Sequence, residues 1–375
     1  MEVSEREKER LVSVRRVVGS GVERVVGTDR AARIRQTEAR ARRRLIRALD
    51  VEGRNVPPRK PAKKGPAKKA GAKKAAAKKA APKRTRAQLI DELGRATPEG
   101  LGEGSTLPDG LHWAAPDPFP DYPRTQGDYK TLLAGLHERL RPRTYVEVGV
   151  SVGKTLTLSR ARTIAVDPAY RILMPLRCDL AAFPETSDDF FARPDAFDHF
   201  EGVPTDLAFI DGMHLAEYAL RDFINMEKQM APGGVIVLDD MLPRNSLEAF
   251  RVRRTRAWAG DVFKVHEVLR THRPDLTLIP ISTEPTGSYL VVGLDPSNTV
   301  LEEVYDSLVS FLTSPDPQEV DPAWADRHAC YDPDVVLGSG VFEEAARLRD
   351  AGAGREEFDE LWRRLAALPY ATAAD

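Results

Sequence analysis

The sequence contains very little cysteine. Only Cys178 and Cys330 occur among 375 residues, and neither belongs to a Cys-x-x-Cys pair. This scarcity excludes a disulfide framework and a zinc site built from thiolates. We therefore expect a reduced, cytoplasmic protein in which both thiols are buried and inert.

Long apolar runs are missing as well. No stretch reaches the roughly 18 apolar residues that a membrane-spanning helix needs. The first residues, 1–6, are mostly charged and lack the apolar segment of a secretory signal. The sequence therefore predicts no membrane partner.

Residues 1–86 have few acidic residues, whereas the rest of the chain has an excess of them. The formal net charge is −1, but residues 1–86 hold 28 Lys or Arg against 9 Asp or Glu, and the remainder holds 28 against 48. Residues 1–56 are predicted to be a basic helical segment, with a floppy basic arm as the alternative. A helical stripe favours coiled-coil-like contact and a homo-oligomer; its members are Leu11, Val14, Val18 and Val22.

Residues 57–104 are predicted to be a disordered linker and connector. From Pro57 to Thr85 there is no acidic and no large apolar residue, and lysine pairs recur every five residues from 63/64 to 78/79. Nothing in such a segment offsets the entropy of ordering, and it resembles the lysine-alanine tails of linker histones. Nonspecific contact of residues 57–86 with nucleic acid or another polyanion is one interpretation. A soluble spacer, or binding to the acidic remainder of the chain, are the others.

From about residue 124, apolar runs rich in β-formers alternate with helical patterns such as Tyr129–Leu140 and Leu215–Met230. The alternation predicts an α/β fold with a mostly parallel sheet and helices on both faces. A short loop, 282–287, separates the last two runs, so the last strand should be antiparallel. Helical stretches at about 299–313 and 341–367 are expected outside the sheet. The six runs are Thr144–Val150, Thr163–Asp167, Leu207–Asp211, Val235–Asp239, Leu276–Ile281 and Ser288–Leu294.

A glycine-containing loop follows the first of these strands. Its pattern is Glu147-x-Gly149-x-x-x-Gly153, and Asp167 ends the next strand, 20 residues after Glu147. Glycines allow a tight turn and close approach of a ligand, and the amides of a following helix favour an anion. A carboxylate at the position of Asp167 suits the ribose hydroxyls of a nucleoside cofactor.

The loop also has features of two other kinds of nucleotide site. Gly149 to Thr155 resembles a phosphate-binding P-loop, but only three residues separate the glycines where that loop has four. The dinucleotide pattern Gly-x-Gly-x-x-Gly is absent because position 151 is Ser. A nucleoside cofactor with a carboxylate, rather than a triphosphate or a dinucleotide, is the favoured ligand.

Several motifs in order resemble methyltransferase family 24, part of the class I superfamily that uses S-adenosylmethionine (SAM). The resemblance covers about 125–295 and implies a Rossmann-like, seven-stranded sheet. It also implies that Glu147, Gly149, Ser151 and Gly153 line the methionine end of SAM, that Asp167 holds the ribose, and that Ser187 and Asp188 lie beside the adenine. The matching pieces are Tyr145–Gly149, Ala165–Pro168, Thr186–Phe191, Phe209–His214, Pro232–Asp240 and Gly260–Lys264. The methyltransferase domain is therefore predicted at 105–296, with a helical extension at 297–375.

Three carboxylates stand at predicted strand ends. Asp211, Asp239 and Asp240 should face the cofactor cleft, where oxygen ligands suit Mg²⁺. His214 lies three residues after Asp211 and is the candidate catalytic base. The arrangement is similar to catechol O-methyltransferase and macrolide-sugar O-methyltransferases. Helix capping by the aspartates and a structural histidine are the alternatives.

The expected activity is therefore metal-assisted O-methylation of a hydroxyl on a small molecule or sugar unit. The alternative is a nucleic-acid-associated protein whose methyltransferase fold modifies or accompanies a polyanion. Two minor features have open roles. Asp128 and Tyr129 could line the acceptor pocket, or Asp128 could cap a helix. The arginines at 251, 253, 254 and 256 could bind an acidic substrate, although a solvated face is the favoured interpretation.

Overall fold

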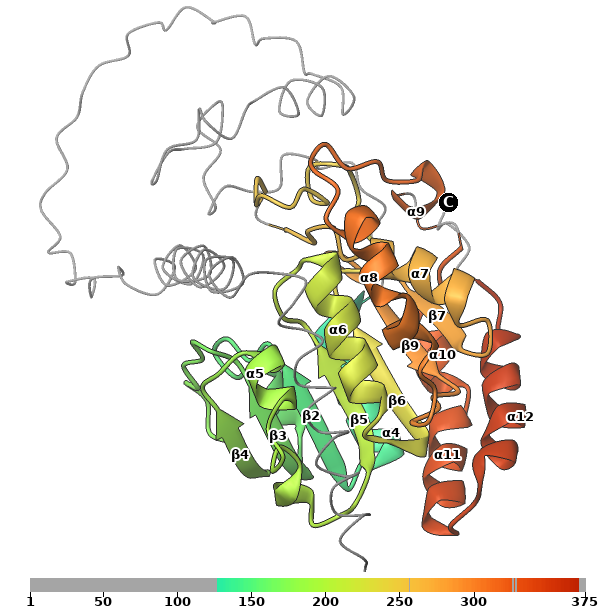
Figure 1. Cartoon of the computed structure of the whole chain (residues 1–375). Coiled ribbons are helices and arrows are strands. Elements are labelled where there is room, and N and C mark those ends of the chain that lie inside the picture. Colours follow the sequence, from blue (N-terminus) through green and yellow to red (C-terminus); the bar gives the residue numbers. More distant parts are fainter. Residues whose placement is uncertain (1–126, 256, 326, 328, 371–375) are drawn as a thin grey trace, which may run out of the picture. The chain divides into compact units, whose positions relative to one another are not determined.

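The computed structural model describes residues 127–370, except 256, 326 and 328 (Figure 1). The predicted segments 1–56 and 57–104 lie outside these residues, as does the start of the predicted domain at 105. All helices and strands below belong to the described part of the chain.

A seven-stranded sheet forms the centre of the fold, in the order β4-β3-β2-β5-β6-β9-β7. Neighbouring strands from β4 to β6 pair in parallel, whereas β9 pairs antiparallel with both β6 and β7. The predicted hairpin and the single antiparallel last strand are confirmed. The strands are β2 (Thr144–Val148), β3 (Arg162–Val166), β4 (Asp179–Phe183), β5 (Thr205–Ile210), β6 (Met230–Leu238), β7 (Thr277–Ile281) and β9 (Ser288–Val292).

One strand of the sheet has no counterpart among the six predicted runs. β4 has the sequence Asp-Leu-Ala-Ala-Phe, which contains no β-branched residue. It lies at the edge of the sheet, and its residues are only partly buried. Pairing with β3, rather than intrinsic propensity, therefore makes this segment a strand.

Helices cover both faces of the sheet (Figure 1). Val146 and Val148 of β2 belong to one apolar cluster, and Tyr145 belongs to the other. The first cluster is covered by α5 (Ser187–Phe191), α6 (Ala216–Glu227), α7 (Lys264–His272) and α8 (Val300–Leu312). The second is covered by α4 (Tyr129–Leu140), α10 (Pro333–Gly338), α11 (Val341–Asp350) and α12 (Arg355–Ala366).

The start of α4 settles the role of Asp128. Its Oδ1 accepts hydrogen bonds from the backbone N–H groups of Lys130 (2.8 Å) and Thr131 (3.0 Å). Asp128 is therefore the N-cap of α4, which confirms the helix-capping interpretation. A two-stranded pairing places this cap beside the last hairpin, because β1 (Gly127–Asp128) runs parallel to β8 (Thr283–Glu284).

The connection between β2 and β3 differs from the prediction. No α-helix follows the glycine loop; a four-residue 3₁₀-helix, Thr155–Leu158, takes its place. The chain passes from the end of β2 at Val148 to the start of β3 at Arg162, which leaves no room for an α-helix of ordinary length. The expected helix N-terminus at this loop is therefore wrong.

The C-terminal helices pack directly on the sheet. The stretch expected at 341–367 consists of two helices, α11 and α12, separated by Ala351–Gly354. Phe358 and Trp362 of α12 are 1% and 2% exposed. The ring of Phe358 lies so close to Gly233 of β6 that a Cβ there would stand 2.1 Å from it. These helices therefore complete the hydrophobic core, while the domain boundary at 296 stays a prediction.

Two smaller expectations concern the thiols and membranes. Cys330 is buried, as predicted, but Cys178 is partly exposed. Among the described residues, no helix is long and apolar enough to cross a membrane.

We predict that Phe358→Ala destabilises the whole sheet, because it removes a buried ring that packs on β6. The expected loss is about 3–5 kcal/mol in urea unfolding. Asp359→Ala, an exposed change in the same helix, is the control and should stay within about 0.5 kcal/mol of the parent chain. Equal unfolding midpoints for the two variants would mean that α12 is a separate appendage.

Candidate active site

The candidate residues gather at the carboxyl edge of the sheet. The glycine loop follows β2, Asp211 follows β5, and Asp239 and Asp240 follow β6. These three strands are neighbours. In open α/β sheets this edge is where ligands bind.

The glycine loop is built from left-handed backbone positions. Gly149, Ser151 and Gly153 have φ values of +90°, +50° and +75°. A Cβ on Gly149 would lie 1.8 Å from the carbonyl oxygen of Asp211. Glycine is therefore required at 149, because the end of β2 touches the backbone that follows β5.

Asp167 holds this loop from the neighbouring strand. Its Oδ2 accepts from the backbone N–H groups of Val150 (2.9 Å) and Ser151 (2.8 Å), and its Oδ1 accepts from that of Ala169 (2.7 Å). A carboxylate offers about four acceptor positions. These three bonds leave one position on Oδ1, enough for one of the two ribose hydroxyls, and the contact of Asp167 with a ribose stays a prediction.

Glu147 lies beneath the loop and is fully buried. Its carboxylate accepts from the Tyr145 hydroxyl (2.8 Å) and the Thr155 hydroxyl (2.7 Å). Burial raises the pKa of Glu147 to about 8, against the two hydrogen bonds that lower it. Glu147 thus ties β2 to the 3₁₀-helix, and its contact with a cofactor stays a prediction.

Ser187 and Asp188 begin α5, after the N-cap Thr186. Both carboxylate oxygens of Asp188 accept from the guanidinium of Arg221, at 2.9 and 2.8 Å. Arg221 also donates to the Tyr305 hydroxyl at 2.7 Å. Asp188 therefore links α5 to α6 and α8, and its predicted place beside an adenine is not tested by this ion pair.

The structure brings the side chains of Asp211, His214 and Asp240 together. His214 Nε2 lies 3.2 Å from Asp211 Oδ1, and His214 Nδ1 lies 2.7 Å from Asp240 Oδ2. Their donor atoms all lie within 4.8 Å of one another, a spacing that could hold a metal ion. His214 and Asp240 both have left-handed backbone conformations, with φ of +55° and +63°. Strain of this kind is concentrated at functional sites.

Asp239 stands next to this group, and a hairpin loop holds both neighbouring acids. The hydroxyl of Ser288 donates to Asp239 Oδ1 (2.7 Å), and that of Thr286 donates to Asp240 Oδ1 (2.6 Å). The sequence predicted Asp211, Asp239 and Asp240 as ligands. The structure groups His214, rather than Asp239, with the other two. No sequence signal pointed to the supporting hydroxyls.

Buried like charges dominate the electrostatics here. Burial raises the pKa of Asp211 to about 6, with added repulsion from Asp240. Burial and the charges of Asp240 and Asp211 raise the pKa of Asp239 well above its usual value. Burial alone would lower the pKa of His214, but the carboxylates of Asp240 and Asp211 raise it well above its usual value. A cation at this cluster would relieve the repulsion.

Two aromatic residues adjoin the cluster. Trp258 stacks on His214, with ring centroids 5.0 Å apart and an interplanar angle of 9°, and its carbonyl oxygen lies 2.7 Å from His214 Nδ1. The Tyr129 phenol has its pKa raised by burial and by Asp211, Asp239 and Asp240. Its place in an acceptor pocket stays a prediction.

Arg251 and Arg254, two of the four arginines before Trp258, do not lie on a solvated face; Arg256 is outside the described residues. Arg254 is 5% exposed. Arg251 donates to Glu217 (2.7 and 3.0 Å) and to Asp261 (2.6 Å). The prediction of a solvated face is wrong for Arg251, because its acidic partners lie 34 positions earlier and 10 positions later in the chain and give no local signal.

Comparison with known proteins finds a match to one part of the sheet. A methyltransferase domain model, that of methyltransferase family 24, matches residues 179–241. This span includes β4, β5, β6, Asp211, His214 and both Asp239 and Asp240. The comparison with curated proteins finds no significant match.

The solved structures that match this chain are distant in sequence and overlap it only in part. An O-methyltransferase from Bacillus cereus in complex with SAH is 15% identical, covers 44% of this chain and 80% of its own, and has a TM-score of 0.34. The O-methyltransferase TomG from Streptomyces achromogenes, in complex with SAM, is 18% identical, covers 44% and 78%, and has a TM-score of 0.32. SAH-bound PaMTH1 from Podospora anserina is 12% identical, with coverage of 44% and 78% and a TM-score of 0.33.

We predict that Gly149→Ala costs more stability than its backbone conformation alone explains. Gly202 is the matched control, because it also has a positive φ, +79°, but no atom lies within 4 Å of an added Cβ. Gly202→Ala should cost about 1–2 kcal/mol. Gly149→Ala should lower the free energy of unfolding by at least about twice as much as Gly202→Ala does, because the added methyl group also clashes with the Asp211 carbonyl oxygen. Equal thermal shifts would show that β2 and β5 do not meet as closely as described.

Proposed function

We propose that this chain is a class I methyltransferase of family 24 and that it transfers the methyl group of SAM to a hydroxyl oxygen. The acceptor is a small molecule or a sugar unit. The observation that carries the proposal is the His214 imidazole, held between Asp211 and Asp240 beside the glycine loop. A hydroxyl needs its proton removed on methylation, and a positioned imidazole is suited to that task.

The residues at the sheet edge fit SAM. Gly149, Ser151 and Gly153 would adjoin its methionine end, with Glu147 supporting them from below. Asp167 would hold the ribose through the acceptor position that its backbone contacts leave. Ser187 and Asp188 would lie near the adenine. SAM supplies an electrophilic methyl group, so the chain mainly aligns and activates the acceptor.

A divalent cation fits the acids. Asp211 and Asp240, whose oxygens belong to the group spaced for a metal ion, would hold it. Asp239 would be a third carboxylate, and an all-oxygen set of this kind suits Mg²⁺. A bound cation would lower the pKa of an acceptor hydroxyl. Use of His214 as a ligand instead would favour transition metals over Mg²⁺, and a comparison of Mg²⁺ with Mn²⁺ and Zn²⁺ distinguishes the two.

We give the two imidazole nitrogens separate roles. Asp240 and the Trp258 carbonyl each accept the Nδ1 proton at 2.7 Å, which leaves Nε2, 3.2 Å from Asp211 Oδ1, to take a proton from the acceptor. Because the two carboxylates raise the pKa of His214, Nε2 would be free to act as a base only with a cation bound to offset their charge. The acceptor oxygen bonds to the methyl carbon as the carbon–sulfur bond breaks. The hydroxyl proton passes to Nε2, and S-adenosylhomocysteine leaves.

The lysine-rich arm supports a separate proposal. Residues 57–86 would bind a polyanion through counterion release. Because those residues lie outside the described part of the chain, this proposal depends on composition alone. It is independent of the chemistry at His214.

We predict that His214→Gln and Asp211→Asn each lower turnover by about 100-fold or more, the usual contribution of a general base. Labelled SAM with a panel of catechols, phenols and monosaccharide-bearing acceptors gives the rate, and calorimetry should show SAM affinity within a few-fold of the parent chain. His199→Gln is the control, because His199 also lies beside an aspartate, Asp179, but outside the site. Turnover that survives His214→Gln, or that is indifferent to EDTA, argues against the base or the metal respectively.

A further inference from the structure

The sequence motif Gly260–Lys264 has no place in the proposed chemistry, yet the structure gives its polar members specific contacts behind His214. Asp261 is fully buried. Its Oδ1 accepts from the backbone N–H of Ala216 at 2.9 Å. Ala216 is the first residue of α6, and the cap residue Leu215 supplies no side-chain hydrogen bond. Asp261 therefore caps α6 from 45 residues further along the chain.

Capping of α6 bears directly on the base. Only Leu215 separates His214 from Ala216, so the start of α6 fixes the backbone on which the imidazole stands. Gly260 adds a second restraint, because a Cβ there would lie 1.7 Å from the His214 carbonyl oxygen. His214 itself has a left-handed φ of +55°, which a side-chain-bearing residue rarely adopts without support.

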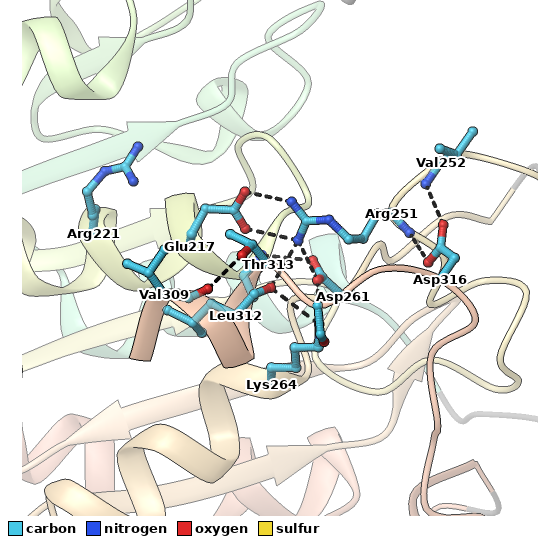
Figure 2. A network of polar contacts seen from close by, with 12 residues as sticks. Glu217, Arg221, Arg251, Val252, Asp261, Lys264, Val309, Leu312, Thr313 and Asp316 are labelled. Atoms are coloured by element: carbon cyan, nitrogen blue, oxygen red, sulfur yellow. Dashed lines mark hydrogen bonds and ion pairs between the residues drawn. The ribbon is translucent and has the colours of Figure 1, made fainter. Parts of the chain in front are cut away.

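Two cations hold the Asp261 carboxylate in place. Arg251 Nη1 lies 2.6 Å and Lys264 Nζ lies 2.8 Å from Asp261 Oδ2. Figure 2 shows the Arg251 guanidinium between Glu217 and Asp261. With Glu217 the group contains two acids and two bases, so the buried charges balance.

The same cations reach the C-terminal part of the chain. Arg251 Nη1 (3.0 Å) and Lys264 Nζ (3.3 Å) both donate to the carbonyl oxygen of Leu312, the last residue of α8. Lys264 also donates to the Ser314 hydroxyl at 2.8 Å. Asp316 accepts from the backbone N–H of Arg251 at 2.9 Å. A region outside the matched family span thus anchors the segment that carries Trp258 over His214.

We propose that Asp261, clamped by Arg251 and Lys264, is a positioning residue that fixes the start of α6 and thereby the His214 imidazole. Asp261 touches no reacting atom in this account. The effect of Asp261 on catalysis rests on the proposed function. Its effect on the position of the His214 imidazole can be measured without any reaction.

Two double variants with equal charge separate capping from ion pairing. Asp261→Asn with Lys264→Met keeps a side-chain oxygen for Ala216 N–H and leaves Arg251 paired with Glu217. Asp261→Ala with Lys264→Met has the same charge but no cap. Asn is as good an N-cap as Asp, and Ala is a poor one.

The first readout is the His214 ring signal in ¹⁵N–¹H NMR spectra of the full chain, assigned by its loss in His214→Gln. We expect this signal to keep its position in the Asn pair and to shift or broaden in the Ala pair. The second readout is kinetic. The Asn pair should keep kcat within a few-fold, and the Ala pair should lose at least about 10-fold in kcat with SAM affinity unchanged.

Phe358→Leu is the control for lost stability, because Phe358 lies in α12, in the cluster on the other face of the sheet. It should lower Tm without moving the His214 signal or kcat. If the Ala pair does not fold, Arg251→Gln replaces it, since Arg251 is half-buried and its loss removes one of the two cations on Asp261. A smaller shift of the same signal is then expected.

The outcomes separate the two proposals. An unchanged His214 signal in the Ala pair, or in Arg251→Gln, overturns the positioning role whatever the activity. A shifted signal in a chain whose parent methylates no hydroxyl leaves the positioning role standing and overturns the proposed function. A signal and a kcat that change equally in the Asn and Ala pairs contradict the cap and leave only the charge of the cluster.

Discussion

The contact between Gly149 and the Asp211 carbonyl determines how the rest of the site is arranged. It exists because β2 and β5 are parallel neighbours whose ends are in register, with Val148 opposite Ile210. A side chain at 149 would push these strand ends apart. The glycine loop and the first acid are thereby held against each other, so the proposed cofactor wall and the proposed reaction centre adjoin without any intervening element.

The second constraint is the concentration of negative charge at this edge. Three aspartates follow two adjacent strands, and their burial is tolerated only because each has partners. The hydroxyls of Thr286 and Ser288 support Asp240 and Asp239 from the last hairpin. His214 bridges Asp211 and Asp240. Asp261 and its two cations then hold the backbone after His214. Support for the site thus extends through α6, α7 and α8.

Much of the fold follows from the sequence because period-two runs and a short hairpin loop are local signals. Tyr129–Leu140 forms α4 with the predicted bounds. β4 is not among the predicted runs because its alanines carry no strand signal. The helix expected after Gly153 is a 3₁₀-helix because the connection between β2 and β3 is short. The positions of Asp211, Asp239 and Asp240 at strand ends predict them as candidates, and the spacing of three residues after Asp211 predicts His214. The sequence does not predict the contacts of Arg251, Asp261 and Trp258, because these contacts join residues tens of positions apart.

The central claim is that the loop from Gly149 to Gly153, braced by Asp167, binds SAM. Calorimetric titration of the full chain with SAM tests it most directly, with ATP and GTP as competitors and Asp167→Ala as the disabled variant. We expect one SAM site per chain and no displacement of SAM by either nucleoside triphosphate. Asp167→Ala should bind SAM at least about tenfold more weakly, a loss of roughly 1.4 kcal/mol in binding free energy. Absence of SAM binding by the folded chain, or displacement of SAM by ATP or GTP, would contradict it.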